Sequence, residues 1–399
     1  MPASRVRKFL LYCLIVFGSV MAGAVAAEVY LTWHASQRLN LPFYNILYPY
    51  VMFRPIESYT FETKETFAMS HFKSRVFVYT NEDGFRIPAA QYKLPKEKPA
   101  GQFRIAFLGG SLVELSSTFD TGLPGSLRTV LRERYPGRDI EVINAGIQSC
   151  VSRQSLVQLL LTVVDYHPDM VILYDGGNDL GLPLTYESRA NFPYNFQAMQ
   201  EAWDLYRADR QQSLWRLALE RSNLYRLVRA RLHPDERKMT PTADAPFAGT
   251  NALPAGRILS DAGFVQHHVA EYLSNWRKLV ELSAAYHYQP VCVLSPAGGF
   301  QPEHAVPVMM KSFHLDRATA TDWLKALQLL YGEAGRQIGE MRGAYPAATF
   351  IDLSQFLDPP DRYFWDLGHV YDEANMVLAQ RIYPEIKASV ERGLREAGR

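Results

Sequence analysis

The sequence contains few of the residues on which small disulfide-bonded or zinc-binding proteins depend. Its three cysteines, Cys13, Cys150 and Cys292, are too few for a disulfide framework and lack the paired spacing of a zinc site. Positive and negative side chains balance, with 42 Lys and Arg against 41 Asp and Glu and a formal net charge of +1. Proteins that bind nucleic acids normally carry a basic surplus, so we expect no nucleic-acid partner.

Several recognisable patterns are also absent. No Gly-x-Gly-x-x-Gly or phosphate-loop sequence occurs, and the sequence therefore predicts no nucleotide and no other cofactor. No segment of about 20 to 50 residues recurs, which excludes a solenoid. His267 and His268 are adjacent, and neighbouring residues on a helix face different directions, so no metal site is predicted there.

The chain does contain one long apolar run, close to its N-terminus. The basic residues Arg5, Arg7 and Lys8 precede an apolar run over residues 9–27, which Glu28 ends. A helix that crosses a bilayer core needs about 20 residues at about 1.5 Å each. The run therefore predicts a membrane-spanning helix, the structure that satisfies its own backbone in lipid.

This run also predicts the compartment of the chain. We expect a cytoplasmic segment over residues 1–8, a single-pass anchor in the inner membrane over residues 9–33, and the rest in the periplasm or outside the cell. Ala24-Val25-Ala26 resembles a processing site, so a cleaved signal peptide is an alternative. A buried helix of a soluble protein is a third interpretation.

The remainder of the chain divides into a lead-in and a main domain. Residues 34–102 are rich in Pro, Tyr and Phe without sustained periodicity, which predicts an irregular, strand-containing lead-in that packs on the main domain over residues 103–399. There, short apolar runs alternate with amphipathic stretches, which predicts a three-layer α/β/α sandwich with a five-stranded parallel sheet. The expected strands are 104–108, 140–143, 170–174, 290–294 and 349–353, and the expected helices are about 123–134, 152–165, 265–285, 319–341 and 373–395.

An insertion over about residues 181–262 interrupts this alternation. It contains a helical pattern from about Phe196 to Leu232 and a loop rich in Pro, Ala and Thr from His233 to Asn251. We expect this insertion to lie over the carboxyl edge of the sheet as a lid.

Unusual residues follow three of the expected strands and precede the last helix. The strands end in Gly109-Gly110-Ser111, in Asn144-Ala145-Gly146 and in Gly176-Gly177-Asn178-Asp179, and Asp366-Leu367-Gly368-His369 stands before the final helix. Ligands of parallel α/β sheets bind outside the carboxyl ends of the strands. These four segments are therefore expected to meet at one edge of the sheet.

Together, in this order and spacing, the four segments resemble the motif blocks of the SGNH hydrolase superfamily, also called GDSL-type esterases. The resemblance covers about residue 104 to the C-terminus and implies a flavodoxin-like sheet. It implies that Ser111 is the nucleophile, His369 the general base and Asp366 the residue that orients the base. It further implies oxyanion donors at the Ser111 and Gly146 N–H groups and at the Asn178 side chain.

One position departs from the family pattern, which usually has Gly-Asp-Ser where this chain has Gly109-Gly110-Ser111. The change leaves nucleophile and base in place and concerns how the loop is braced, a role that we assign to Gly110 and Asp179. It resembles a subgroup of bacterial envelope proteins, as does the lead-in sequence from Thr80 to Arg86.

Elementary chemistry agrees with these implied roles. A serine hydroxyl becomes a nucleophile when an imidazole accepts its proton, and a carboxylate on the other ring nitrogen fixes the tautomer of that imidazole. Preorganised N–H donors stabilise the oxyanion that forms.

The sequence thus predicts an SGNH-type serine esterase that cleaves a small acyl ester, in the first place acetyl, through an acyl-enzyme. Its expected partners are a carbohydrate-linked ester of the envelope or an exported polymer, the membrane, and envelope polysaccharide machinery. Two alternatives remain open: an O-acetyltransferase that uses the same site, and a non-catalytic scaffold or glycan-binding subunit of an envelope assembly.

Overall fold

A computed structural model describes residues 3–37, 45–48, 50–185, 187–193, 222–232, 252–297, 301–356 and 362–398. The chain forms two compact units, residues 1–43 with 200–243 and residues 44–199 with 244–399. The predicted loop from His233 to Asn251 and most of the predicted helix from Phe196 to Leu232 lie outside the described residues.

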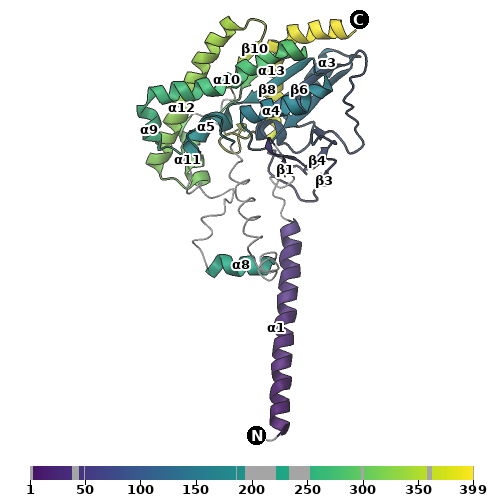
Figure 1. The fold of residues 1–399 in the computed structure, drawn as a ribbon, viewed down its shortest axis with the longest axis vertical. Helices are drawn as coiled ribbons and strands as arrows, with labels where there is room; N and C mark the ends of the chain where they lie inside the picture. Colours follow the sequence, from purple (N-terminus) through teal and green to yellow (C-terminus); the bar gives the residue numbers. More distant parts are fainter. Residues whose placement is uncertain are drawn as a thin grey trace. The chain divides into compact units, whose positions relative to one another are not determined.

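The first unit contains the apolar N-terminal helix. Helix α1 (Ala3–Gln37) includes an apolar segment, Arg7–Tyr30, with a mean hydropathy of 2.3, which is long and apolar enough to cross a membrane. Near its carboxyl end, Glu28 Oε2 accepts hydrogen bonds of 2.8 Å from Ser222 Oγ and from the backbone N–H of Leu224. These donors lie at the start of helix α8 (Asn223–Leu232), beside α1 in Figure 1. A carboxylate at a helix N-terminus satisfies N–H groups that have no acceptor within the helix.

The second unit is built on a mixed eight-stranded sheet with the order β10-β9-β8-β6-β7-β5-β4-β3. The first five strands in this order are parallel, and β5, β4 and β3 extend them with antiparallel pairs. The strands are β3 (Thr60–Glu62), β4 (Phe77–Thr80), β5 (Arg86–Ile87), β6 (Phe103–Gly109), β7 (Ile140–Gly146), β8 (Met170–Asp175), β9 (Gln289–Leu294) and β10 (Thr349–Asp352).

The prediction of a five-stranded sheet is therefore incomplete, because the lead-in contributes three short strands to the same sheet. A separate antiparallel hairpin, β1 (Asn45–Tyr48) and β2 (Met52–Pro55), precedes them. All residues of β6, β7 and β8 are buried, as expected for strands covered on both faces.

Helices cover both faces of the sheet (Figure 1). One core packs under α4 (Ser152–Leu161), α10 (Ala262–Tyr286) and α12 (Arg317–Ala344), with the short α9 (Ala255–Ser260) against α12. The other core packs under α3 (Leu123–Arg134) and α13 (Asp372–Ala397). Helices α2 (Ser111–Glu114) and α5 (Gly177–Thr185) follow the ends of β6 and β8, and α11 (Pro302–Phe313) packs against α12.

A buried arginine ties the lead-in to the segment that follows Ser111. The Arg86 guanidinium donates hydrogen bonds to the carbonyl oxygens of Glu114 and Ser116 and, at 3.2 Å, to that of Phe77. Burial lowers the pKa of Arg86 to about 10, against the opposing influence of Asp372. Arg86 of strand β5 thus fixes the end of α2 by hydrogen bonds to these backbone carbonyl oxygens.

Candidate active site

The first strand end brings Ser111 to the carboxyl edge of the sheet. Strand β6 ends at Gly109, and α2 begins at Ser111. A Cβ on Gly109 would lie 2.2 Å from the carbonyl oxygen of Tyr174, so only glycine allows β6 and β8 to approach so closely here. The tight turn leaves Ser111 partly exposed at the start of the helix.

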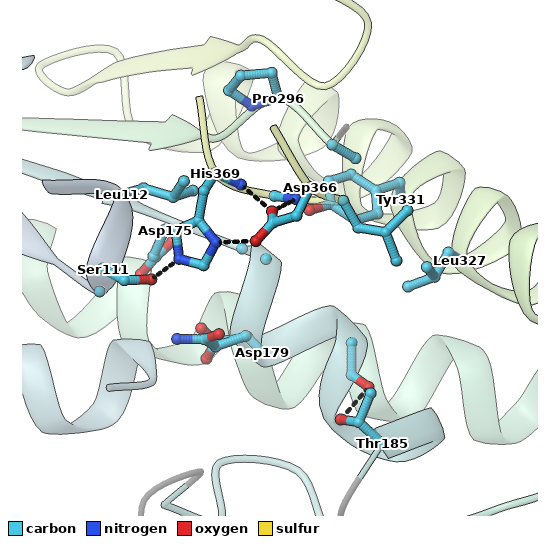
Figure 2. A pocket seen from close by; sticks show the side chains of 18 of the residues that line it. Ser111, Leu112, Asp175, Asp179, Thr185, Pro296, Leu327, Tyr331, Asp366 and His369 are labelled. Carbon is cyan, nitrogen blue, oxygen red and sulfur yellow. Dashed lines mark hydrogen bonds and ion pairs between the residues drawn. The ribbon is translucent and has the colours of Figure 1, made fainter. Parts of the chain in front are cut away.

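The loop before α13 supplies the histidine and the aspartate. His369 Nε2 lies 2.8 Å from Ser111 Oγ, and His369 Nδ1 lies 2.6 Å from Asp366 Oδ2. The second oxygen, Asp366 Oδ1, accepts the backbone N–H groups of Gly368 and His369 at 2.8 and 2.6 Å. Figure 2 shows His369 between Ser111 and Asp366. The carboxylate therefore fixes both the loop and the orientation of the imidazole.

Asp366 and His369 each stabilise the charged form of the other side chain. Burial alone would raise the pKa of Asp366, but the charge of His369 and the hydrogen bonds from His369 outweigh burial and lower it. Burial alone would lower the pKa of His369, but the Asp366 carboxylate raises it above its ordinary value. With the two side chains 30% and 32% exposed, this arrangement favours an ionised Asp366 and a more basic His369.

The three predicted oxyanion donors are not in equivalent positions. Ser111 and Asn178 both line the cavity beside the triad. Asn178 Nδ2 donates to the carbonyl oxygen of Cys150 at 2.8 Å, which holds the amide beside the turn after β7. Gly146 is not among the residues that line this cavity, and its N–H donates to Asn144 Oδ1 at 3.1 Å. The structure therefore does not bring Gly146 together with Ser111 and Asn178.

Gly146 has a packing role instead. A Cβ at this position would lie 2.7 to 2.9 Å from the backbone N, Cα and Cβ atoms of Glu114 in α2. The missing side chain lets α2 lie directly on strand β7. A glycine at the end of a strand is compatible with both roles. It fits this close approach of helix and strand as well as it fits an oxyanion donor.

Gly110 and Asp179 lie where they can shape the loops around Ser111. A Cβ on Gly110 would lie 3.0 Å from Asn178 Nδ2 and 3.3 Å from the carbonyl oxygen of Cys150. The buried Asp179 carboxylate accepts the N–H of Ser152 at 3.1 Å and its hydroxyl at 2.6 Å. These bonds join the first turn of α5 to the start of α4.

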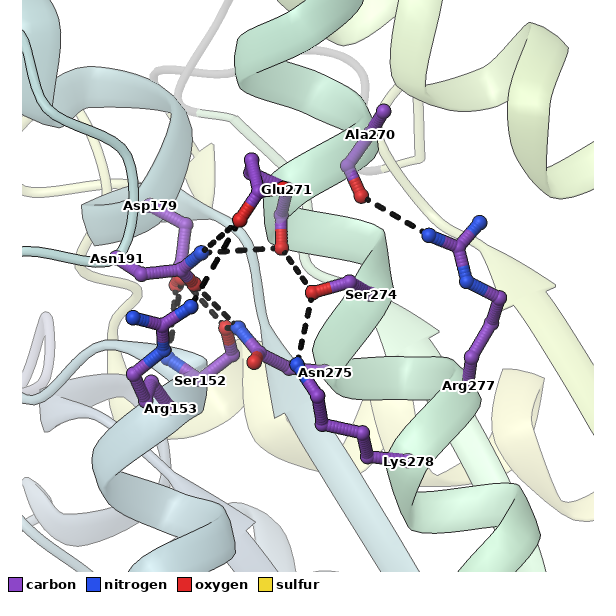
Figure 3. A network of polar contacts seen from close by, with 10 residues as sticks. All are labelled: Ser152, Arg153, Asp179, Asn191, Ala270, Glu271, Ser274, Asn275, Arg277 and Lys278. Atoms are coloured by element: carbon purple, nitrogen blue, oxygen red, sulfur yellow. Dashed lines mark hydrogen bonds and ion pairs between the residues drawn. The ribbon is translucent and has the colours of Figure 1, made fainter.

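A wider polar network supports Asp179 (Figure 3). Asn275 on α10 donates to Ser152 Oγ at 2.8 Å and also to Asn191, which in turn donates to the Glu271 carbonyl oxygen at 3.1 Å. Burial raises the pKa of Asp179 to about 6, although its hydrogen bonds from Ser152 oppose the rise. The network therefore holds a carboxyl group that titrates well above its ordinary range.

His267, His268 and Cys150 do not join the triad. His268 is buried with Nε2 at 2.9 Å from the carbonyl oxygen of Asp179, whereas His267 is exposed. Cys150 lines the cavity, but burial raises its pKa to about 12, which keeps it a thiol. Among the described residues, no group of three or more His, Cys, Asp and Glu side chains could hold a metal ion.

Two buried acids near the site were not predicted from the sequence. Asp175 ends β8, lines the cavity, and accepts hydrogen bonds from Tyr272 Oη at 2.6 Å and Trp276 Nε1 at 3.0 Å. Glu114 lies at the end of α2, fully buried. Burial raises the pKa values of both carboxyl groups well above the ordinary range. A carboxyl residue at the end of an otherwise apolar strand was the available signal for Asp175.

The cavity at Ser111 has a volume of about 230 Å³. The triad and the Gly176–Asp179 turn form one part of its wall. The apolar side chains that line it include Leu112, Leu184, Phe313, Trp323, Leu327 and Leu367. Helices α5, α11 and α12 thus line a space that begins at the Ser111 hydroxyl.

No family model and no curated protein matches this chain. Among solved structures, it is similar to the acetylxylan esterase Axe2 from Geobacillus stearothermophilus, with 15% identity, a TM-score of 0.34, and 71% of this chain and 94% of that chain covered. It is also similar to LAE5, an alpha/beta hydrolase enzyme from the metagenome of Lake Arreo, with 13% identity, a TM-score of 0.35 and the same coverage. At these levels of similarity, the function has to be inferred from the site itself.

Proposed function

We propose that this protein is a serine ester hydrolase of the SGNH type. The observation that carries the proposal is the hydrogen-bonded series from Ser111 Oγ to His369 Nε2 at 2.8 Å and from His369 Nδ1 to Asp366 Oδ2 at 2.6 Å. Such a series supplies a nucleophile, its base and the group that orients the base. It opens on a cavity, where a substrate can reach the hydroxyl.

In the first half of the reaction, Ser111 Oγ attacks the ester carbonyl carbon while its proton moves to His369 Nε2. The resulting imidazolium lies against the ionised Asp366, which stabilises its charge. The carbonyl oxygen becomes an oxyanion next to the Asn178 amide and the Ser111 N–H, groups that cost no reorganisation at that moment. The C–O bond to the alcohol then breaks, and His369 returns the proton to the departing alcohol.

In the second half, water attacks the acyl-enzyme and releases the acid. His369 accepts a proton from this water, the bond between Ser111 Oγ and the acyl carbon breaks, and the serine hydroxyl is restored. Every step uses protein side chains, backbone N–H groups and water.

The substrate that we propose is a small acyl ester, with acetyl as the first candidate, on a carbohydrate of the envelope or of an exported polymer. The length and apolar character of Arg7–Tyr30 support a location at the inner membrane with the second unit in the periplasm or outside the cell. Envelope polysaccharide machinery is then the expected partner.

The O-acetyltransferase alternative uses the same acyl-enzyme and differs in the molecule that accepts the acyl group. Water and a sugar hydroxyl compete for that step, so product analysis with and without a saccharide acceptor distinguishes the two. The scaffold alternative predicts that Ser111 does not react with a fluorophosphonate probe. A serine already hydrogen-bonded to an oriented histidine favours labelling.

The direct experiment compares Ser111→Ala with the unchanged protein on p-nitrophenyl acetate. We expect loss of turnover with unchanged folding, judged by circular dichroism and thermal unfolding. Ser283→Ala is the matched control, because Ser283 lies on α10 away from the cavity and donates to the carbonyl oxygen of Val280. Retained turnover in Ser111→Ala would reject the proposed nucleophile.

A further inference from the structure

The cavity that begins at Ser111 is larger than an acetyl group requires. Its volume of about 230 Å³ corresponds to roughly seven water molecules at about 30 Å³ each. An acetyl group on Ser111 Oγ would fill the part next to the triad and leave the remainder empty. The lining residues Thr185 and Leu327 lie beyond Asp366, on the side of the pocket away from Ser111 (Figure 2).

Apolar side chains from three helices form this distant part. Leu184 comes from α5, Phe313 from α11, and Trp323 and Leu327 from α12. Leu184 is 2% exposed, and the other three are partly buried against the hydrophobic cores around α11 and α12. We call these four side chains the apolar arm of the cavity. Their surfaces favour a ligand without polar groups.

Three polar residues along the same wall direct their hydrogen bonds into the protein. Thr185 Oγ1 donates to the carbonyl oxygen of Gly181 at 3.0 Å. Asp179 accepts from Ser152, and Asp175 Oδ1 accepts from Tyr272 and Trp276. Burial raises the pKa of Asp175 well above its ordinary value, which disfavours a negative charge on this carboxyl group.

A sugar ring would lose hydrogen bonds to water in such a space without gaining replacements. The carbohydrate portion of the proposed substrate therefore belongs outside the arm, toward solvent. The acyl group is the portion that remains attached to Ser111 after the alcohol leaves, and it is the apolar portion of the ester. Both facts favour the acyl group as the occupant of the arm.

We propose that the apolar arm holds an acyl chain longer than acetyl, so that the preferred substrates are esters of acids with about four to eight carbons. This inference rests on the proposed function, because the chain must be carried to the arm by an ester that acylates Ser111, and it replaces acetyl, the first candidate there, with a longer acyl group. It makes Leu184, Phe313, Trp323 and Leu327 the residues that determine acyl-chain length.

The test measures kcat/KM for p-nitrophenyl acetate, butyrate, hexanoate and octanoate. Each methylene that enters the arm is expected to raise kcat/KM about fourfold until the arm is full. The hexanoate-to-acetate ratio should then exceed about ten. A parallel series of acetate esters with longer alcohols should give no such rise, since the alcohol faces solvent.

Leu327→Trp fills the arm and should lower the hexanoate-to-acetate ratio at least about tenfold. Leu329→Trp is the matched control, because Leu329 lies on the same helix, is 40% exposed and does not line the cavity. The control should keep the ratio of the unchanged protein. Trp323→Ala enlarges the arm and should move the best chain length upward, which provides a second readout if Leu327→Trp does not fold.

The failures of the two proposals are distinguishable. A protein that turns over p-nitrophenyl acetate but loses kcat/KM steadily with acyl length retains the esterase function and overturns the acyl assignment. A rise with alcohol length instead assigns the arm to the alcohol and also overturns it. Absence of turnover with every ester, together with an unlabelled Ser111, would reject the proposed function itself.

Discussion

Gly110 and Asn178 approach each other so closely that a Cβ atom on residue 110 would lie 3.0 Å from Asn178 Nδ2. The backbone of Gly110 is in the extended region, with φ −83°, so a side chain there is limited by space and not by backbone strain. The position at which the sequence departs from the family pattern is thus the position that faces the predicted oxyanion donor. Glycine at residue 110 allows the Asn178 amide to lie beside Ser111.

Gly110→Ala should therefore displace the Asn178 amide. We expect kcat for p-nitrophenyl acetate to fall roughly 10- to 100-fold, part of the loss expected when an oxyanion donor is removed altogether. Gly339→Ala in α12 is the control, because no atom lies within 4 Å of a Cβ there. It should keep kcat and stabilise the helix by up to about 1 kcal/mol. Equal kcat values for the two variants would contradict the role of Gly110.

Asn178 and Gly146 should respond to substitution in opposite ways. Asn178→Ala removes a donor that lines the cavity and should lower kcat about 100- to 1000-fold with little change in unfolding. Gly146→Ala places a Cβ against the backbone of Glu114 and should lower the free energy of unfolding by about 1–3 kcal/mol. Steady-state kinetics and chemical denaturation on both variants measure the difference. Full stability in Gly146→Ala would contradict the packing role of Gly146.

Catalysis should depend on pH through His369. The imidazole must be neutral to accept the proton of Ser111, so kcat/KM falls as pH decreases through the pKa of His369. Because Asp366 raises that pKa, the fall should begin above the ordinary value of 6.5. Asp366→Asn removes the raising charge, so the midpoint should move to lower pH while kcat drops on the order of 10⁴-fold. The measurement is a pH profile of kcat/KM for each protein. An unmoved midpoint would show that Asp366 does not raise the pKa of His369.

Asp179 should make stability depend on pH in the direction opposite to an ordinary carboxylate. Its pKa is raised from 3.8 to about 6, so its contribution to stability is complete below pH 3.8 and is lost as pH rises through about 6. This difference corresponds to roughly 3 kcal/mol. The side chain in Asp179→Asn stays neutral. Between pH 4 and pH 8, the free energy of unfolding of this variant should therefore rise relative to that of the unchanged protein by up to that amount.

Chemical denaturation across this pH range tests the expectation. Asp322→Asn is the control, since Asp322 is exposed on α12 and pairs with Lys325 at 3.0 Å. A surface ion pair contributes about 0–1 kcal/mol, so this variant should change stability little at any pH. A constant difference between Asp179→Asn and the unchanged protein would show that Asp179 is ionised throughout.

The sequence predicted the central strands and the long helices because their patterns are strong. Five apolar runs became β6 to β10, and the helix predicted over 123–134 is α3 with the same bounds. Strands β3 to β5 are two to four residues long, too short for a periodic pattern, and their place in the sheet depends on tertiary pairing. Helices α5 and α11 each contain an internal proline, which weakens the local helical signal.

The candidate site was predictable where residue type decides the chemistry. A serine, a histidine and an aspartate at strand ends and a late loop came together as expected from their order. Backbone donors were not predictable in the same way, because every residue except proline has an N–H and its direction depends on the turn. The apolar arm was also unpredictable, since α11 and α12 reach the site only through tertiary packing.

The bonds that Arg86 makes set a lower limit on how far the chain can be shortened. Its guanidinium donates to the carbonyl oxygens of Glu114 and Ser116, at and just beyond the end of α2, and its removal would leave these oxygens without that donor. A polypeptide that starts at β6 would keep every residue of the triad yet lack this support. A fragment that folds on its own should therefore include β5, and one that starts at β6 should be less stable than the whole second unit.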